Sequence, residues 1–305
     1  MTEHTTSRSA GEFTPGGPPS CPELISGLAS IVDRYDVLLC DIWGVLHDGV
    51  AAHAGAGKAL SSARESGRHV ILVSNAPRPG SSVIAMLDGM GVPTSAHDGI
   101  VTSGDLTRAF LDERPGTKVV HIGPAHDRVL FDGLDIVMCD VEHADIVICT
   151  DLVDELTETP EDYREVLASI ASRRLPLVCA NPDIVVEHGD RLVWCAGSVA
   201  RLYEEMGGEV IYFGKPHALI YAEAIRRAEA ISGRAATKKR VLCIGDALHT
   251  DITGACAAGF DSLFIAGGIH AKELGAVNGA QPQLSALARL FPGAIRPSFV
   301  IEKLG

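Results

Sequence analysis

Short, continuous apolar runs alternate with longer segments of helical period along most of this 305-residue chain. The runs predict strands at Val37–Cys40, Val70–Val73, Val119–Ile122, Ile146–Cys149, Leu177–Cys179, Val210–Phe213, Val241–Ile244 and Leu263–Ile265. Their apolar residues are consecutive and do not alternate with polar ones, which is typical of strands buried on both faces. Strands separated by helices form βα units around a mostly parallel sheet. The sequence therefore predicts an α/β protein.

Charge and apolar patterning exclude several classes of partner. The chain has 26 Lys and Arg against 39 Asp and Glu, and the formal net charge of −13 opposes binding to nucleic-acid phosphates. No run of about 18 apolar residues is present, so we expect no membrane span. Residues 1–20 contain a run of Pro and Gly and no apolar stretch, which predicts a disordered tail and not a signal peptide. Together these features predict a cytoplasmic protein.

Polar residues directly follow four of the predicted strands. Asp41 follows the first, Ser74 and Asn75 follow the second, and Lys215 and Asp246 follow two later ones. Ligands of open α/β sheets bind outside the carboxyl ends of the strands, so we expect these side chains to converge on one crevice. For any single residue, the alternative is that it caps the next helix. Two carboxylates, a hydroxyl and a lysine at four strand ends favour a functional site.

These side chains have the chemistry of phosphoryl transfer. An aspartate exposed at a strand end, as expected for Asp41, can act as a nucleophile. Asp246 and Asp251 lie five residues apart across a strand-to-helix turn, where they can hold Mg²⁺, a hard cation that prefers oxygen ligands. Lys215 supplies positive charge, and the two residues after the second strand supply neutral donors for the phosphate oxygens.

The order of these motifs resembles that of the haloacid dehalogenase superfamily, in its class IIA, NagD-like branch of predicted sugar phosphatases. The nucleophile motif is matched by Asp41 in DIWGV, and the second motif by Ser74. The third is matched by Lys215 in GKPHALIY, and the fourth by Asp246 and Asp251 in GDALHTD. Each motif is short, but four of them in the family's order make a specific pattern.

The resemblance implies a domain organisation. The core would be a Rossmann-like, doubly wound parallel sheet formed by residues 21–114 and 209–305, with an inserted α/β cap of the C2 type over residues 115–208. The stretch ANPD, with Asn181 and Asp183, resembles the segment that links cap and core in this branch. In the family the cap selects the substrate and often carries dimer contacts, which implies a substrate-side position for these two residues and a homodimer.

The resemblance also implies a reaction. A Mg²⁺-dependent phosphatase of this kind would hydrolyse a small phosphorylated metabolite, such as a sugar phosphate, through an aspartyl-phosphate on Asp41. The metal would be held by Asp41, Asp246, Asp251 and the main-chain carbonyl of Trp43. Dehalogenation also uses an aspartate nucleophile, but a metal-free reaction has no use for Asp246 and Asp251, so we expect it less.

Position 43 departs from the family pattern. Phosphatases of the superfamily generally have a second aspartate here, which protonates the leaving group and then deprotonates water, whereas this chain has Trp43. An indole has one N–H and no ionisable proton near neutral pH. One hypothesis gives the acid/base role to His47 in VLHDG, since a histidine pKa of about 6.5 suits both transfers. The other is a protein that binds a phosphorylated ligand but hydrolyses it poorly.

Overall fold

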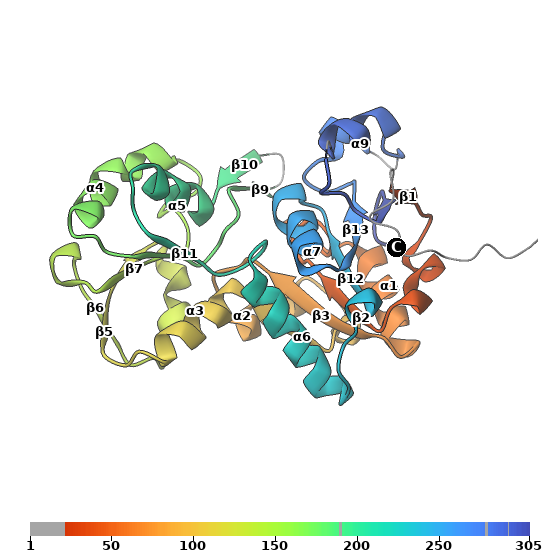
Figure 1. The fold of residues 1–305 in the computed structure, drawn as a ribbon, viewed down its shortest axis with the longest axis horizontal. Coiled ribbons are helices and arrows are strands. Elements are labelled where there is room, and N and C mark those ends of the chain that lie inside the picture. The colour runs from red at the N-terminus through yellow and green to blue at the C-terminus, as the bar shows by residue number, and fades with distance from the viewer. Residues whose placement is uncertain (1–21, 189–190, 278–279, 292) are drawn as a thin grey trace, which may run out of the picture.

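The chain forms two parallel sheets in two lobes (Figure 1). The computed structural model describes residues 22–188, 191–277, 280–291 and 293–305. The tail predicted for residues 1–20 lies outside these ranges. The first and last strands of the described chain lie in the same lobe, and the middle of the sequence forms the other (Figure 1). No helix in the described ranges is long and apolar enough to cross a membrane.

The larger sheet has seven strands, and every neighbouring pair is parallel. Its order is β1 (Glu23–Leu24), β14 (Phe299–Ile301), β13 (Asp261–Ile265), β12 (Val241–Gly245), β2 (Val37–Cys40), β3 (His69–Ser74) and β4 (Gly99–Thr102). From β2 the chain moves outward through β3 and β4, and from β12 it moves the other way through β13 and β14. The strand order therefore reverses between β2 and β12, which is the position where open α/β sheets bind ligands.

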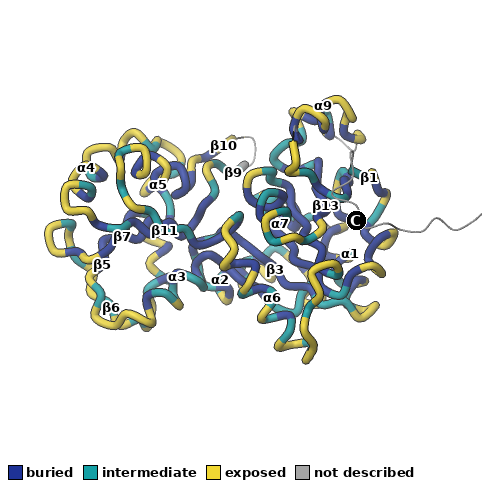
Figure 2. Tube along the Cα trace, in the orientation of Figure 1, coloured by how far each residue is buried: buried dark blue, intermediate teal, exposed yellow. Residues whose placement is uncertain are grey.

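Helices cover both faces of the larger sheet, as continuous apolar strands require. On one face, Leu38 of β2 belongs to a cluster with α1 (Ala54–Glu65) and α2 (Gly80–Gly89). On the other face, Leu39 belongs to a cluster with α6 (Ala218–Ser232) and α7 (Thr253–Ala258). Successive residues of one strand thus pack into the apolar clusters on opposite faces of the sheet. In Figure 2 the strands of this sheet are mostly dark blue, the colour of buried residues. The predicted α/β fold with a Rossmann-like core is confirmed.

The smaller sheet has five parallel strands with helices on both faces. Its order is β11 (Val210–Tyr212), β8 (Leu177–Cys179), β7 (Ile146–Cys149), β5 (Thr117–Ile122) and β6 (Ile136–Met138). α4 (Arg164–Ser172) and α5 (Ala196–Glu205) pack on one face, and α3 (Ser103–Asp112) packs on the other. An antiparallel hairpin of β9 (Val185–His188) and β10 (Arg191–Trp194) lies beside this sheet (Figure 1).

Short helices complete the described chain. They are α8 (Ala271–Leu274), α9 (Leu284–Leu290), η1 (Leu28–Ser30), η2 (Val32–Arg34), η3 (Thr94–Ala96), η4 (Ala125–Phe131), η5 (Val141–His143), η6 (Pro160–Tyr163), η7 (Lys238–Arg240) and η8 (Leu248–Ile252). Among these, η8 matters for the site because it follows β12 directly and carries Asp251.

One strand lies in a different sheet from the one expected. The predicted boundary between residues 208 and 209 leaves Val210–Tyr212 with the larger sheet, but this strand, β11, pairs with β8 in the smaller one. The chain returns to the larger lobe only after β11. An apolar run shows that a strand is buried but does not show which of two parallel sheets it joins. The predicted boundary therefore lies before β11, whereas the structure places it after β11.

Candidate functional site

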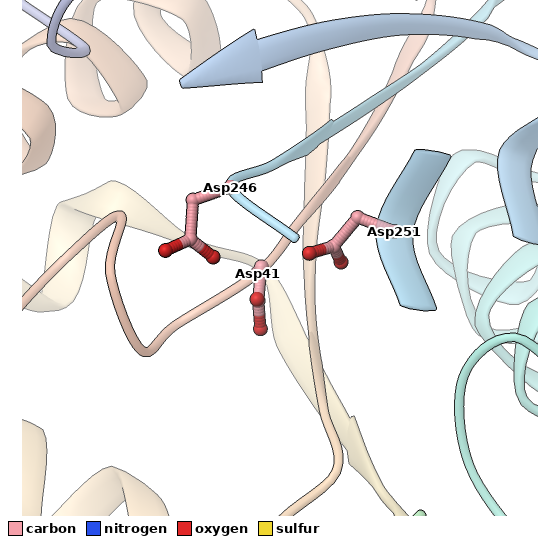
Figure 3. Close-up of side chains that lie close together, drawn as sticks. All are labelled: Asp41, Asp246 and Asp251. Carbon is pink, nitrogen blue, oxygen red and sulfur yellow. The ribbon is translucent and has the colours of Figure 1, made fainter. Parts of the chain in front are cut away.

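Three carboxylates from separate segments meet at the carboxyl end of the larger sheet (Figure 3). Asp41 directly follows β2, Asp246 directly follows β12, and Asp251 lies on η8. One oxygen of each lies within 4.8 Å of one oxygen of both others. The three residues are 9%, 5% and 4% exposed. The reversal of strand order between β2 and β12 places these side chains side by side, as predicted for Asp41 and Asp246.

Lys215 joins the cluster from the segment that follows β11. Its Nζ lies 2.6 Å from Oδ1 of Asp41 and 2.7 Å from Oδ1 of Asp251. The residue is 3% exposed. The segment that follows a strand of the smaller sheet thus provides the cation that pairs with Asp41 and Asp251 of the larger lobe. The predicted convergence of Lys215 on Asp41 is present, although its strand is not a neighbour of β2.

The cluster carries more negative charge than its lysine can balance. If every group were ionised, three carboxylates and one ammonium would leave two uncompensated negative charges. Burial and the nearby Asp251 raise the pKa of Asp41 well above its usual range, and burial raises the pKa of Asp246 to about 7. Burial opposes the charged form of Lys215, but Asp251 and Asp41 outweigh it and raise its pKa. Protons or a further cation must balance such a site.

The donor set fits a hard divalent cation. Carboxylate oxygens are the protein ligands that Mg²⁺ prefers, and it needs one or two of them alongside water and substrate oxygens. All three carboxylates accept main-chain hydrogen bonds. The N–H of Ile42 donates to Oδ1 of Asp41 (2.7 Å). The N–H of Ile269 donates to Oδ2 of Asp246 (2.8 Å), and the N–H of Ala247 donates to Oδ2 of Asp251 (3.1 Å). The structure thus presents preoriented oxygens in a cluster that has an excess of negative charge.

Glycines leave room for these carboxylates. Gly44 has a φ of +77°, and a Cβ there would overlap the carboxylate of Asp246. A Cβ on Gly268 would overlap the same carboxylate, and one on Gly245 would overlap that of Asp251. The close backbone approach that only glycine permits is therefore part of how the cluster forms.

A cavity opens beside the cluster and is bounded by both lobes. Asp41 and Asp246 form part of its wall. The loop between β2 and α1 contributes Trp43, Asp48 and His53, and the segment after β8 contributes Asp183, Val185 and Val186. Sequence reasoning missed His53 and the two valines. No motif marks these residues, because the conformation of a loop and the position of a hairpin place them on the cavity wall.

Trp43 lies on the cavity wall, where the family's second aspartate is replaced. Its indole packs edge-on against the ring of His47, with centroids 5.0 Å apart. A Cβ on Gly49, which has a φ of +90°, would overlap the indole, so the loop backbone is also packed closely against it. The use of the Trp43 carbonyl as a metal ligand stays a prediction.

His47 does not have the placement expected for a substitute acid/base group. The side chain is fully buried and is not among the residues that line the cavity. Its Nδ1 accepts a hydrogen bond from the N–H of Gly49 (2.9 Å), and its Nε2 is buried with no hydrogen-bond partner among the described residues. Burial lowers the pKa of His47 to about 4. The position of His47 near Asp41 in the sequence did not reveal that its ring is buried. This placement disfavours the acid/base role of His47, which stays a prediction.

The side-chain amide of Asn75 links other site residues. Its Nδ2 donates to Oδ1 of Asp183 (2.9 Å) and to the carbonyl of Lys215 (3.2 Å), while its Oδ1 accepts from the N–H of Lys215 (2.7 Å). Both side-chain amide hydrogens are therefore in use within the protein, and the phosphate-binding role of Asn75 stays a prediction. The residue links the strand end of β3 to the ANPD segment and to the lysine.

Ser74 and Asn181 lie near the site but not on the cavity wall. Ser74 ends β3, the neighbour of β2, and its Oγ accepts a hydrogen bond from the N–H of Ala76 (3.1 Å). The side-chain oxygen of Asn181 accepts from the N–H of Asp183 (3.2 Å) and so fixes the turn. The phosphate-binding role of Ser74 and the substrate-side role of Asn181 stay predictions, while Asp183 does line the cavity.

The fold and site define a class of proteins in which an aspartate at the switch point of a doubly wound parallel sheet faces a second lobe, also built of strands and helices. A family model described as haloacid dehalogenase-like hydrolase matches residues 38–137, and one described as HAD-hydrolase-like matches residues 212–290. A solved hydrolase of the haloacid dehalogenase-like family from Brucella suis 1330 is 44% identical, with a TM-score of 0.82 over 92% of this chain and 100% of that one. This chain belongs to the haloacid dehalogenase-like hydrolase family.

Characterised relatives agree with the predicted NagD-like branch. A D-glycerol 3-phosphate phosphatase of Mycobacterium tuberculosis is 31% identical over 250 residues, which span 80% of this chain and 66% of that protein. The ribonucleotide monophosphatase NagD of Escherichia coli K12 is 27% identical over 241 residues, 77% of this chain and 89% of that protein. The resemblance read from the motifs is confirmed.

A metal-bound structure supports the predicted cofactor. A glycerol phosphate phosphatase from Mycobacterium tuberculosis, solved in complex with magnesium, is 25% identical to this chain and has a TM-score of 0.62. The alignment covers 88% of this chain and 76% of that one. Together with the three buried carboxylates, this supports Mg²⁺ as the cofactor, as predicted.

Proposed function

We propose that this protein is a Mg²⁺-dependent phosphatase of small phosphate monoesters and that Asp41 is its nucleophile. The observation that carries the proposal is the buried cluster of Asp41, Asp246 and Asp251 around Lys215 beside a cavity. The named relatives are phosphatases, which supports the same reaction class.

The orientation of Asp41 suits nucleophilic attack. Its Oδ1 accepts a hydrogen bond from the N–H of Ile42 (2.7 Å) and contacts Nζ of Lys215 (2.6 Å). With Oδ1 held in this way, Oδ2 is the oxygen that attacks phosphorus. The bond from phosphorus to the ester oxygen breaks, and water then hydrolyses the aspartyl-phosphate. Mg²⁺ held by Asp41, Asp246 and Asp251 would supply positive charge to the phosphate oxygens.

The cavity wall favours a small substrate with an apolar or mixed surface next to its phosphate. Trp43, Val185 and Val186 supply apolar contacts, and Thr250 supplies a hydroxyl. We propose a small phosphorylated metabolite as the ligand. Dehalogenation is disfavoured, because a metal-free reaction leaves the Asp246 and Asp251 carboxylates without a role.

Phosphate release from a broad panel of monoesters, measured with and without MgCl₂, tests this function. We expect Mg²⁺-dependent turnover that falls by about 10⁴-fold or more in Asp41→Asn, because the nucleophile is lost. Asp151→Asn is a matched control, since Asp151 is a largely buried carboxyl that does not line the cavity. Turnover that survives Asp41→Asn would contradict the mechanism. Tight binding of vanadate with no turnover of any ester would instead favour a phosphate-binding protein.

A further inference from the structure

A phosphatase with Trp43 in place of the usual aspartate needs another group that gives a proton to the leaving oxygen. Outside the carboxylate cluster, the titratable side chains on the described cavity wall are Asp48, His53 and Asp183. We propose that Asp183, on the segment after β8, is the catalytic acid and base of this site. This inference rests on the proposed phosphatase function.

Asp48 is a poor proton donor because its carboxylate accepts hydrogen bonds from the backbone of its own loop. Its Oδ1 accepts hydrogen bonds from the N–H groups of Val50 (2.9 Å) and Ala51 (2.8 Å). These bonds favour the charged form, and the pKa of Asp48 is lowered. The residue therefore stays ionised and turns the loop.

His53 also lies on the cavity wall, in the loop between β2 and α1. Its charged neighbours are Asp48 and Lys303, and burial lowers its pKa. The first step of a phosphatase requires a group that already carries an acidic proton, and a neutral imidazole is a base. His53 therefore fits the first proton transfer less well than a carboxylic acid does.

The geometry holds Asp183 next to the groups that carry the reaction. Its Oδ1 accepts from Nδ2 of Asn75 (2.9 Å), Asn75 binds the main chain of Lys215, and Nζ of Lys215 contacts Asp41. The N–H of Asp183 donates to Oδ1 of Asn181, and its carbonyl accepts from the N–H of Gly197 (3.1 Å). One carboxyl oxygen is thus anchored, the backbone is fixed on both sides, and Oδ2 is available to a substrate in the cavity.

The surroundings of Asp183 keep a proton on it to higher pH than usual. Burial raises its pKa, and Asp251 raises it further, while Lys215 and the Asn75 hydrogen bond oppose the shift. Asp246 in the larger lobe and Asp151 in the smaller lobe also face it, and both are like charges when ionised. A carboxylic acid kept neutral by burial is a known form of general acid.

The two proton transfers then balance. As Oδ2 of Asp41 forms a bond to phosphorus, the ester P–O bond breaks and the leaving oxygen takes the proton of Asp183 to depart as an alcohol. The resulting Asp183 carboxylate accepts a proton from water while that water oxygen attacks the aspartyl-phosphate. The P–O bond to Asp41 breaks, inorganic phosphate forms, and both aspartates return to their starting states.

The dependence of rate on the leaving group tests the role of Asp183. p-Nitrophenol leaves as a stable anion and needs no proton, whereas glycerol leaves only with one. In single-turnover experiments with MgCl₂, we expect Asp183→Asn to slow the first step on glycerol 3-phosphate by about 10²–10⁴-fold. Release of nitrophenol from p-nitrophenyl phosphate should fall by less than about tenfold. The asparagine retains an acceptor for Asn75, which preserves the anchor.

Matched variants make the outcome decisive. Asp127→Asn removes another buried carboxyl in the same lobe, one that pairs with Arg78 and does not line the cavity, and should leave the ratio of the two rates unchanged. Equal losses on both substrates in Asp183→Asn, or a selective loss in His53→Gln with none in Asp183→Asn, would overturn the inference while leaving the phosphatase proposal intact. A wild-type protein that releases phosphate from no ester of the broad panel would overturn both. Thermal unfolding of Asp183→Asn, compared with the wild type, separates a folding defect from a chemical one.

Discussion

The carboxyl edges of the two parallel sheets bury acidic side chains in opposite ways. At the larger sheet, Asp41, Asp246 and Asp251 lie together and share Lys215. At the smaller sheet, Asp151 follows β7 and its Oδ1 accepts a hydrogen bond from the N–H of Leu152 (2.9 Å). Burial raises the pKa of Asp151 to about 8, with no cation among the causes of the shift.

The comparison shows that burial alone does not make an acid functional. An isolated buried carboxyl lowers its cost by taking up a proton, and it then behaves as a neutral polar group. A cluster built around a lysine keeps part of its charge and attracts a further cation. The larger sheet therefore has a site for a metal, while Asp151 at the corresponding edge of the smaller sheet is buried away from the cavity wall.

Removal of Lys215 should produce the largest effect. In Lys215→Met, Asp41 and Asp251 lose their shared cation, and we expect a loss of about 3–5 kcal/mol in unfolding free energy at pH 8. The loss should shrink at acid pH, because the raised pKa of Asp41 favours its protonated form there. Urea denaturation at several pH values measures it. The exposed Lys239→Met is the control and should change stability by less than about 0.5 kcal/mol. Equal stabilities for the two variants would show that the cluster does not need its lysine.

A pair of glycine substitutions separates backbone strain from damage to the cluster. Gly44 and Gly133 have similar φ values, +77° and +75°, but nothing lies within 4 Å of a Cβ built on Gly133. Alanine should cost about 1–2 kcal/mol at either position through its left-handed conformation. Gly44→Ala should cost more and also weaken Mg²⁺-dependent activity, because its Cβ overlaps the Asp246 carboxylate. Thermal melts and phosphate release measure both; identical behaviour would contradict the packing argument.

The pH dependence of stability should reveal Asp151. Its folded pKa of about 8 lies above its ordinary value of 3.8, so folding favours the protonated form. The stabilising contribution is complete at low pH and is lost as the pH rises from about 4 through 8. In Asp151→Asn, the fall in unfolding free energy between pH 6 and 9 should be smaller than in the wild type. The exposed Asp132→Asn should retain the wild-type slope. An unchanged slope in Asp151→Asn would mean that Asp151 is ionised in the folded protein.

The smallest expected effect is that of Trp43→Asp on turnover, which tests whether the smaller lobe supplies the acid of the reaction. If Asp183 transfers the proton, Trp43→Asp should raise turnover of alkyl phosphates by less than about tenfold, because the step already has an acid. A gain of about 10²–10⁴-fold would show that the tryptophan leaves the site without acid/base help. Steady-state rates on glycerol 3-phosphate decide this, with the thermal stability of the variant as the control.

Much of the fold was predictable because buried parallel strands leave a strong pattern. The continuous apolar runs at Val37–Cys40 and Val241–Ile244 lie in strands β2 and β12, and the polar residues after them meet as expected. The short pairings of β1 and β14 escaped prediction, since two or three residues carry too little periodicity to recognise. The assignment of β11 to the larger sheet failed for a different reason. Its own apolar residues indicate that the strand is buried, but they do not indicate that its partner is β8.

The sequence by itself determined the α/β class, the family, and the aspartates and lysine of the cluster, because these depend on residue type at strand ends. The tertiary structure alone decided which way the loop side chains point: His47 into the core, and Trp43 and His53 onto the cavity wall. It also brought Asp183 to Asn75 across 108 residues of chain. Such contacts depend on how two lobes pack, and no local spacing in the sequence encodes that geometry.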